Sequence, residues 1–295
     1  MNDRIKLDPE FESLMPAVPF SRRGFLISSA ATGFALTAGP IMAQTMIKTP
    51  MDGLEGGDTQ IPAKDGKFIP VYWAAPQAAG RYAVILVVPE IWGAHEHIKD
   101  VARRVAKAGY FAVVTEPYSR IGDLTKLTDI KEVIAGANQL TDQQCFADLD
   151  STVDWAAKQA KADINRLGIT GFCRGGRTVW QYTGHSKRIK AGVAWYGGLN
   201  PMPPAMPLSP IDTADKLNAP VLGLYGGADQ GIPQNMVDRM NAALVAFGKD
   251  KQSMIHVYPD MPHAFNADYR PSYRKEAAED GWRRMLAWFR KHGIA

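Results

Sequence analysis

The chain has 295 residues, of which 46% are hydrophobic and 22% charged, and its formal net charge is +4. This composition is that of an ordinary globular protein with a sizeable core, and the length allows one large α/β domain or two small ones. No run of Lys and Arg interleaves with aromatic residues, so nothing favours binding to nucleic acid.

The N-terminal segment differs in character from the rest of the chain. The sequence SRRGFL at residues 21–26 precedes an uncharged, moderately apolar run that ends near Ala38. The pattern resembles a twin-arginine export signal over residues 1–43, cleaved near Ala43, which would make the export machinery a partner and the periplasm the location. A transmembrane helix needs about 20 apolar residues, so we expect no stable membrane anchor. The alternatives are an uncleaved anchor and a chance Arg pair.

The remaining chain divides into an irregular segment at 44–60, rich in Gly and Asp between 51 and 62, and one domain at 61–295. In chain order, the first predicted strand covers 68–74 and is expected to be antiparallel. A continuous apolar run at 82–88 is typical of a strand covered on both faces, as in parallel sheets. A helix is predicted from about His97 to Gly109, and a strand follows at 111–114.

The second half continues the alternation of strands and helices. Residues 119–144 are less regular and form a candidate lid. The predicted elements after it are a helix at 142–161, a strand at 167–170, a helix after Cys173, strands at 191–196 and 221–225, a helix at 233–247, a strand at 254–257 and a C-terminal helix. This order predicts a single doubly wound, mostly parallel sheet with helices on both faces.

The most informative motif is Gly171-Phe172-Cys173-Arg174-Gly175-Gly176, between a predicted strand and a helix. Its spacing is that of the nucleophile elbow of α/β-hydrolases, with Cys in place of Ser, and its small residues suit the crowded backbones of such a turn. A helix N-terminus also favours a thiolate or a developing oxyanion. The alternative is a buried structural cysteine in a Gly-rich turn.

Four candidate catalytic side chains, Glu90, Cys173, Asp229 and His263, follow predicted strands, at the sheet edge where ligands bind in open α/β folds. Cys173, Asp229 and His263 occur in the chain order of an α/β-hydrolase triad. Cys173 would attack a carbonyl carbon, His263 would transfer protons, and Asp229 would orient His263. The oxyanion donors would be the backbone N–H groups of Arg174 and Ile91.

Other residues compete for these roles. Asp260 precedes His263 by only three residues and reads as a turn former, while His256 lies within a predicted strand. We interpret His95 and His97 as solvated, because their spacing is not that of metal ligands on a helix. We therefore expect neither a metal site nor a cofactor.

The chain contains two cysteines, which cannot form a disulfide framework. Cys145 lies on an amphipathic helical pattern and is expected in the core. A bond between it and Cys173 would block the proposed nucleophile, so both are expected to be free thiols.

Taken together, the motifs at 87–93, 171–176, 226–229 and 262–265 resemble those of the dienelactone hydrolase family, over about residues 55–292. The resemblance implies an α/β-hydrolase fold and a Cys173, Asp229 and His263 triad. It also implies that Glu90 keeps the resting thiol protonated and takes its proton when substrate binds. A carboxylate near a thiol and away from water would have a raised pKa.

The chain departs from that family after the catalytic histidine. Ala264 and Ala267 stand where the family has Ser and an Arg that helps to bind the substrate carboxylate, and Asn266 or Arg270 would be an imperfect substitute. Trp92, and Arg120 by its resemblance to a recurring family Arg, are candidate substrate contacts. The alternative for Arg120 is a surface residue that caps a loop.

The sequence thus predicts a periplasmic hydrolase, a monomer or small homo-oligomer, that cleaves a small lactone or ester through an acyl-enzyme. A broad carboxylesterase or thioesterase with the same triad is the first alternative. A degenerate hydrolase fold that only binds ligands is the second, although such a protein has no need to keep all four side chains. A thiol redox protein usually has Cys-x-x-Cys, which this chain lacks.

Overall fold

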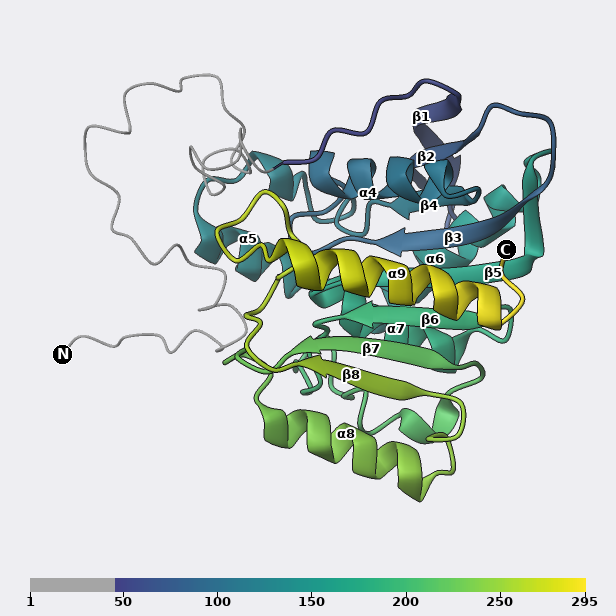
Figure 1. Cartoon of the computed structure of the whole chain (residues 1–295). Helices are drawn as coiled ribbons and strands as arrows, with labels where there is room; N and C mark the ends of the chain where they lie inside the picture. The colour runs from purple at the N-terminus through teal and green to yellow at the C-terminus, as the bar shows by residue number, and fades with distance from the viewer. Residues whose placement is uncertain (1–45) are drawn as a thin grey trace.

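Eight strands form one sheet in the computed structural model, which describes residues 46–295 (Figure 1). The strands are β1 (Leu54–Pro62), β2 (Phe68–Pro76), β3 (Tyr82–Val88), β4 (Phe111–Thr115), β5 (Ala162–Phe172), β6 (Ala191–Trp195), β7 (Val221–Gly226) and β8 (Met254–Tyr258). Their order across the sheet is β1-β2-β4-β3-β5-β6-β7-β8. β2 pairs antiparallel with β1 and β4, and all other pairs are parallel, as the sequence predicted.

Helices cover both faces of the sheet, which confirms the doubly wound architecture. They are α4 (Glu96–Lys107), α5 (Ile130–Ala137), α6 (Asp142–Ala156), α7 (Arg174–His185), α8 (Gln234–Ala246) and α9 (Lys275–Lys291). In Figure 1, α4 and α9 lie on the near face, with α6 and α7 behind the sheet. β4, β6 and β7 are buried along their whole length because both of their faces are covered. Within residues 46–295, no helix is long and apolar enough to cross a membrane.

The predicted irregular segment at 44–60 is wrong in its second half, because β1 occupies 54–62 and pairs with β2 along its whole length. Two glycines interrupt the apolar pattern of β1, which is why the sequence did not predict it, but the same glycines allow the strand to form. Gly56 and Gly57 have φ of +146°, and a Cβ on Gly56 would lie 2.0 Å from the carbonyl oxygen of Trp73 on β2. The folded domain therefore begins before residue 61. The twin-arginine motif and Ala43 lie outside the described residues.

Two further boundaries differ from the expectation. The helix predicted at 142–161 ends at Ala156, and the strand predicted from residue 167 begins at Ala162. After the buried Ala162, residues 163–166 of β5 are partly buried or exposed, so they lack the apolar run that marks the rest of the strand.

The C-terminal helix α9 packs closely on the sheet. A Cβ on Gly281 would lie 2.5 Å from the Trp195 ring of β6, so only glycine allows this approach. Beyond the helix, the side chain of Ile294 is fully buried against Gly168 of β5. The Tyr110 hydroxyl donates to the carbonyl oxygen of Ile294 at 3.3 Å. The last residues therefore belong to the core.

The candidate lid at 119–144 contains a 3-10 turn at Leu124–Lys126 and the helix α5, which Asp129 caps. Arg120 anchors its start, because the guanidinium pairs with Asp148 of α6 at 2.6 Å and with Asp65 in the β1–β2 turn. The side chain of Arg174 donates to Asn138 at 2.8 Å near its other end. Movement of this segment as a lid stays a prediction.

Candidate active site

Cys173 occupies a strained turn between β5 and α7. Its backbone has φ of 53° and ψ of −117°, a conformation that few residues other than glycine adopt. The amide of Cys173 donates to the Trp195 carbonyl on β6 at 3.0 Å, and the Cys173 carbonyl accepts the Arg177 amide at 3.1 Å. These bonds hold the turn that the sequence motif predicted.

Glycine is required where the elbow meets the loop after β3. A Cβ on Gly175 would lie 2.2 Å from the Val88 carbonyl oxygen and 2.6 Å from that of Pro89. This close approach brings the loop that carries Ile91 onto the first turn of α7, which begins at Arg174. The two backbone N–H groups predicted as oxyanion donors therefore belong to segments in direct contact.

Asp229 and His263 form a buried hydrogen-bonded pair. His263 Nδ1 donates to Asp229 Oδ2 at 2.7 Å, while Asp229 Oδ1 accepts the amides of Gly231 and Ile232 at 2.9 and 3.2 Å. Cys173 interacts electrostatically with the His263 imidazole, and His263 Nε2, the ring nitrogen that does not face Asp229, has no hydrogen-bond partner among residues 46–295. Burial alone would lower the pKa of His263, but Asp229 and Cys173 raise it well above its usual value. The Asp229–His263 pair and Cys173 thus lie together in one electrostatically coupled array.

Glu90 lies beside this array, and its ionisation differs from the expectation. Burial favours the neutral acid, but the hydrogen bond from His95 and the charge of Arg270 outweigh it and lower the pKa of Glu90 to about 2. Its Oε2 accepts from the Tyr269 hydroxyl and from His95 Nε2, the latter at 3.3 Å. The expected raised pKa is therefore wrong for the resting state. The sequence did not reveal it because His95 was expected to be solvated and Arg270 lies in a distant part of the chain.

The prediction that His95 and His97 are solvated is also wrong. Their side chains are buried, and His97 Nδ1 bonds to Asp268 Oδ1 at 3.0 Å. The two rings lie 6.0 Å apart, and each is in contact with the Tyr269 ring. Both histidines therefore support the wall of the site around Glu90. Asp260 and His256 take no part in the Asp229–His263 bond.

Tyr196 and Tyr269 were missed in the sequence, and Arg270 was given too little weight. Tyr196 has φ of 37°, and its ring packs edge-on against His263 at 5.1 Å. Arg270 lies over the Tyr269 ring at 5.3 Å and interacts with the charges of Glu90 and Cys173. The position of Tyr196 directly after strand β6 was the one available signal.

The two candidate substrate contacts have different surroundings. Trp92 is 1% exposed, and its Nε1 has no hydrogen-bond partner among residues 46–295. A buried donor of this kind is available to a bound molecule. Arg120 instead pairs with Asp148 and Asp65, which fits the alternative of a loop-anchoring residue.

Other sequence expectations concern thiols and metals. Cys145 and Cys173 are both buried and neither forms a disulfide within residues 46–295, as predicted, and Cys145 lies on α6 in the core. No three His, Cys, Asp or Glu side chains in the described part of the chain are grouped to hold a metal ion.

Comparison with known proteins gives consistent results over nearly the whole domain. The model of the "Dienelactone hydrolase family" matches residues 69–293. A protein of Methylorubrum extorquens named "Putative carboxymethylenebutenolidase" is 51% identical over 290 residues, which cover 98% of this chain and 99% of the relative.

A solved structure and a more distant relative extend the comparison. The Klebsiella pneumoniae crystal structure described as a "Putative Dienelactone Hydrolase" has a TM-score of 0.77 and 47% identity, and the match covers 80% of this chain and 98% of that one. A Bradyrhizobium protein named "Probable 2-oxo-3-(5-oxofuran-2-ylidene)propanoate lactonase" is 30% identical over 223 residues, covering 75% of this chain and 88% of the relative.

Proposed function

This chain belongs to the dienelactone hydrolase family, and we propose that it hydrolyses a small, negatively charged lactone or ester through a Cys173 acyl-enzyme. The observation that carries the proposal is the buried array in which Asp229 bonds to His263, His263 interacts electrostatically with Cys173, and His263 Nε2 is left without a partner among residues 46–295. The array provides a nucleophile, a proton carrier and an orienting carboxylate in the arrangement that acyl transfer requires.

The reaction follows from these positions. Glu90 takes the proton of the Cys173 thiol, the sulfur attacks the carbonyl carbon, and the N–H groups of Arg174 and Ile91 donate to the oxyanion that forms. The carbon–oxygen single bond then breaks, and the leaving oxygen takes a proton from His263, whose raised pKa keeps it protonated. A water molecule gives a proton to His263 and attacks the thioester, the carbon–sulfur bond breaks to release the acid product, and the thiolate takes its proton back from Glu90.

Arg270 supports an anionic substrate. It is partly buried and interacts with the charges of Glu90 and Cys173, so it carries the positive charge that Ala267 cannot supply. A substrate carboxylate bound to Arg270 would offset the positive charge that stabilises ionised Glu90. The pKa of Glu90 would then rise from about 2. Glu90 would then be a better base for the thiol proton at the moment when substrate is present.

Export is a second part of the proposal. The twin-arginine pattern at residues 21–26 supports a periplasmic enzyme cleaved near Ala43. N-terminal sequencing of the protein from the periplasm should begin at Gln44. Replacement of Arg22 and Arg23 by Lys should leave the protein in the cytoplasm, and a periplasmic, uncleaved product would contradict this assignment.

The catalytic proposal is tested by mass spectrometry and turnover with a dienelactone and with p-nitrophenyl acetate. Wild-type protein should form an adduct or turn over, and Cys173→Ala should do neither. Faster reaction of the anionic dienelactone supports the lactonase assignment, whereas faster reaction of neutral p-nitrophenyl acetate supports a broad esterase. Equal inertness of both proteins would favour a ligand-binding role.

A further inference from the structure

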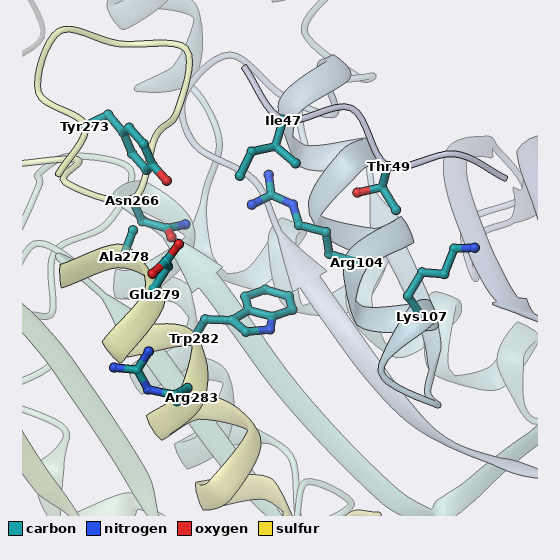
Figure 2. A pocket seen from close by; sticks show the side chains of 10 residues that line it. All are labelled: Ile47, Thr49, Arg104, Lys107, Asn266, Tyr273, Ala278, Glu279, Trp282 and Arg283. Atoms are coloured by element: carbon teal, nitrogen blue, oxygen red, sulfur yellow. The ribbon is translucent and has the colours of Figure 1, made fainter. Parts of the chain in front are cut away.

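A cavity lies on the near face of the sheet, between α4 and α9 (Figure 2). Its volume is about 400 Å³, and none of the four catalytic residues lines it. In Figure 2, the Trp282 indole lies between the α9 side and the Arg104 guanidinium, which points across the cavity. Ile47 and Ala278 add further apolar surface. A planar apolar molecule would find an aromatic ring to pack on here.

The polar groups of this cavity include an amide with no bonding partner. Asn266 is 3% exposed, lines the cavity, and its Nδ2 makes no hydrogen bond within residues 46–295. Buried side-chain amides normally have partners, so an orphaned one at a cavity wall indicates a position for a ligand atom. Figure 2 shows the Asn266 amide directed toward the space in front of Trp282.

Positive side chains stand on the opposite wall. Arg104 donates through Nε to Asp100 at 2.7 Å and through Nη2 to Asp268 at 2.8 Å, which fixes the guanidinium in place. Arg104 also lines the cavity, so this fixed guanidinium faces a bound molecule. Lys107, one turn further along α4, adds a second cation at the rim. A fixed guanidinium beside an ammonium is well suited to bind a carboxylate.

We propose that this cavity binds a small aromatic carboxylate, with its ring on Trp282 and its carboxylate between Arg104, Lys107 and Asn266. The one carboxylate in the lining, Glu279, lies on an exposed turn of α9, 3.9 Å from Lys275, so it is partly neutralised. The cavity also touches the segment that carries the catalytic histidine, because Asn266 follows His263 by three residues. The occupant is therefore a ligand of a site that shares this segment with the catalytic histidine but none of the four catalytic side chains.

The probe for this site is benzoate, titrated into the full chain by isothermal calorimetry. A ligand of this size should bind with a dissociation constant on the order of 1 mM. Benzamide, the neutral analogue of similar shape, should bind about tenfold more weakly because it lacks the carboxylate. Equal binding of the two compounds, or no binding of benzoate, would overturn the proposal.

Two substitutions on one helix locate the site. Ala278→Leu places a larger side chain in the cavity and should abolish benzoate binding, whereas Ala287→Leu, at an exposed position of α9, should leave it unchanged. Unchanged binding by a folded Ala278→Leu protein contradicts the assignment. If that variant does not fold, Lys107→Gln, at an exposed position of α4, should weaken benzoate binding several-fold. Wild-type benzoate affinity in Lys107→Gln would also contradict the assignment.

Discussion

Glu90 is the buried carboxylate on which the electrostatics of the active site depend. Its pKa of about 2 means that it is ionised at rest, held by His95, Tyr269 and Arg270. Because the folded pKa lies below the ordinary value of 4.5, this ionisation stabilises the fold above about pH 4.5. The contribution is lost as the pH falls through about 2.

Removal of the His95 donor should raise the pKa of Glu90. In His95→Leu, the acid limb of the kcat/KM profile should move to higher pH by about one unit, since Glu90 must be ionised to accept the thiol proton. The pH dependence of turnover measures this shift. His256→Leu, on β8 and outside the triad, is the matched control and should keep the wild-type profile. An unchanged profile in His95→Leu would show that Glu90 does not govern the acid limb.

Glu116 gives a second pH dependence, in the stability of the fold. Burial raises its pKa to about 7, although the amides of Ala94 and Tyr118 donate to it. Its raised folded pKa stabilises the protein below about pH 4.5, and this contribution, on the order of 3 kcal/mol at most, is lost as the pH rises through about 7. Chemical denaturation of wild type and Glu116→Gln should show a difference that changes across this window. Parallel curves would refute the assignment.

Some features of the candidate site depend on the adjacent sequence, and others depend on residues that are distant in the chain. Cys173, Asp229 and His263 each follow a strand that the sequence predicted, so their selection as triad candidates needed only local patterns and chain order. The environment of Glu90 depends on Arg270 and Tyr269, and that of His97 on Asp268, all on one distant loop. Only packing brings these partners together, and no local pattern encodes their ionisation.

A methyl group added at Gly175 tests the contact between α7 and the loop after β3. Gly175→Ala places a Cβ against two carbonyl oxygens, so the loop and helix must separate and the two oxyanion donors with them. We expect kcat to fall by about 10², the effect of losing one such donor. Turnover of p-nitrophenyl acetate measures the loss.

A second glycine of the same helix provides the control. At Gly184 of α7, the nearest atom to an added Cβ is 3.4 Å away, an ordinary contact. Gly184→Ala should therefore keep full activity and stabilise the protein by about 0.5–1 kcal/mol through helix propensity. If Gly175→Ala were as active as Gly184→Ala, close contact at the elbow would not be needed for catalysis.

The elements with strong apolar patterns were predicted well. β3 matches its predicted range of 82–88, and α4 and α8 differ from theirs by one or two residues. β1 was missed because its glycines interrupt the pattern and its stability comes from pairing with β2. An edge strand is stabilised largely by pairing with its one neighbour, so its own sequence shows a weaker hydrophobic pattern.

At the scale of the whole molecule, Arg120 links three distant segments through Asp65 and Asp148. The Asp148 side chain is 1% exposed, so Arg120→Met would leave a buried charge without its partner. The free energy of unfolding should fall by about 3 kcal/mol, with KM unchanged. Urea denaturation and steady-state kinetics measure the two quantities. A raised KM without loss of stability would instead make Arg120 a substrate contact.

An exposed ion pair of the same type is the control for Arg120. The side chains of Arg188 and Asp154 are 39% and 48% exposed and lie 2.6 Å apart. Water screens such a pair, so Arg188→Met should change the free energy of unfolding by no more than about 0.5 kcal/mol.

The burial of Ile294 has a consequence for how the protein is made. Its side chain fills space beside Gly168, and Tyr110 binds its carbonyl group, so the central strands lack part of their packing until these last residues have been synthesised. A nascent chain emerging from the ribosome would therefore complete its fold only after translation has passed residue 294. Ribosome stalling a few residues earlier should hold the chain in a protease-sensitive state.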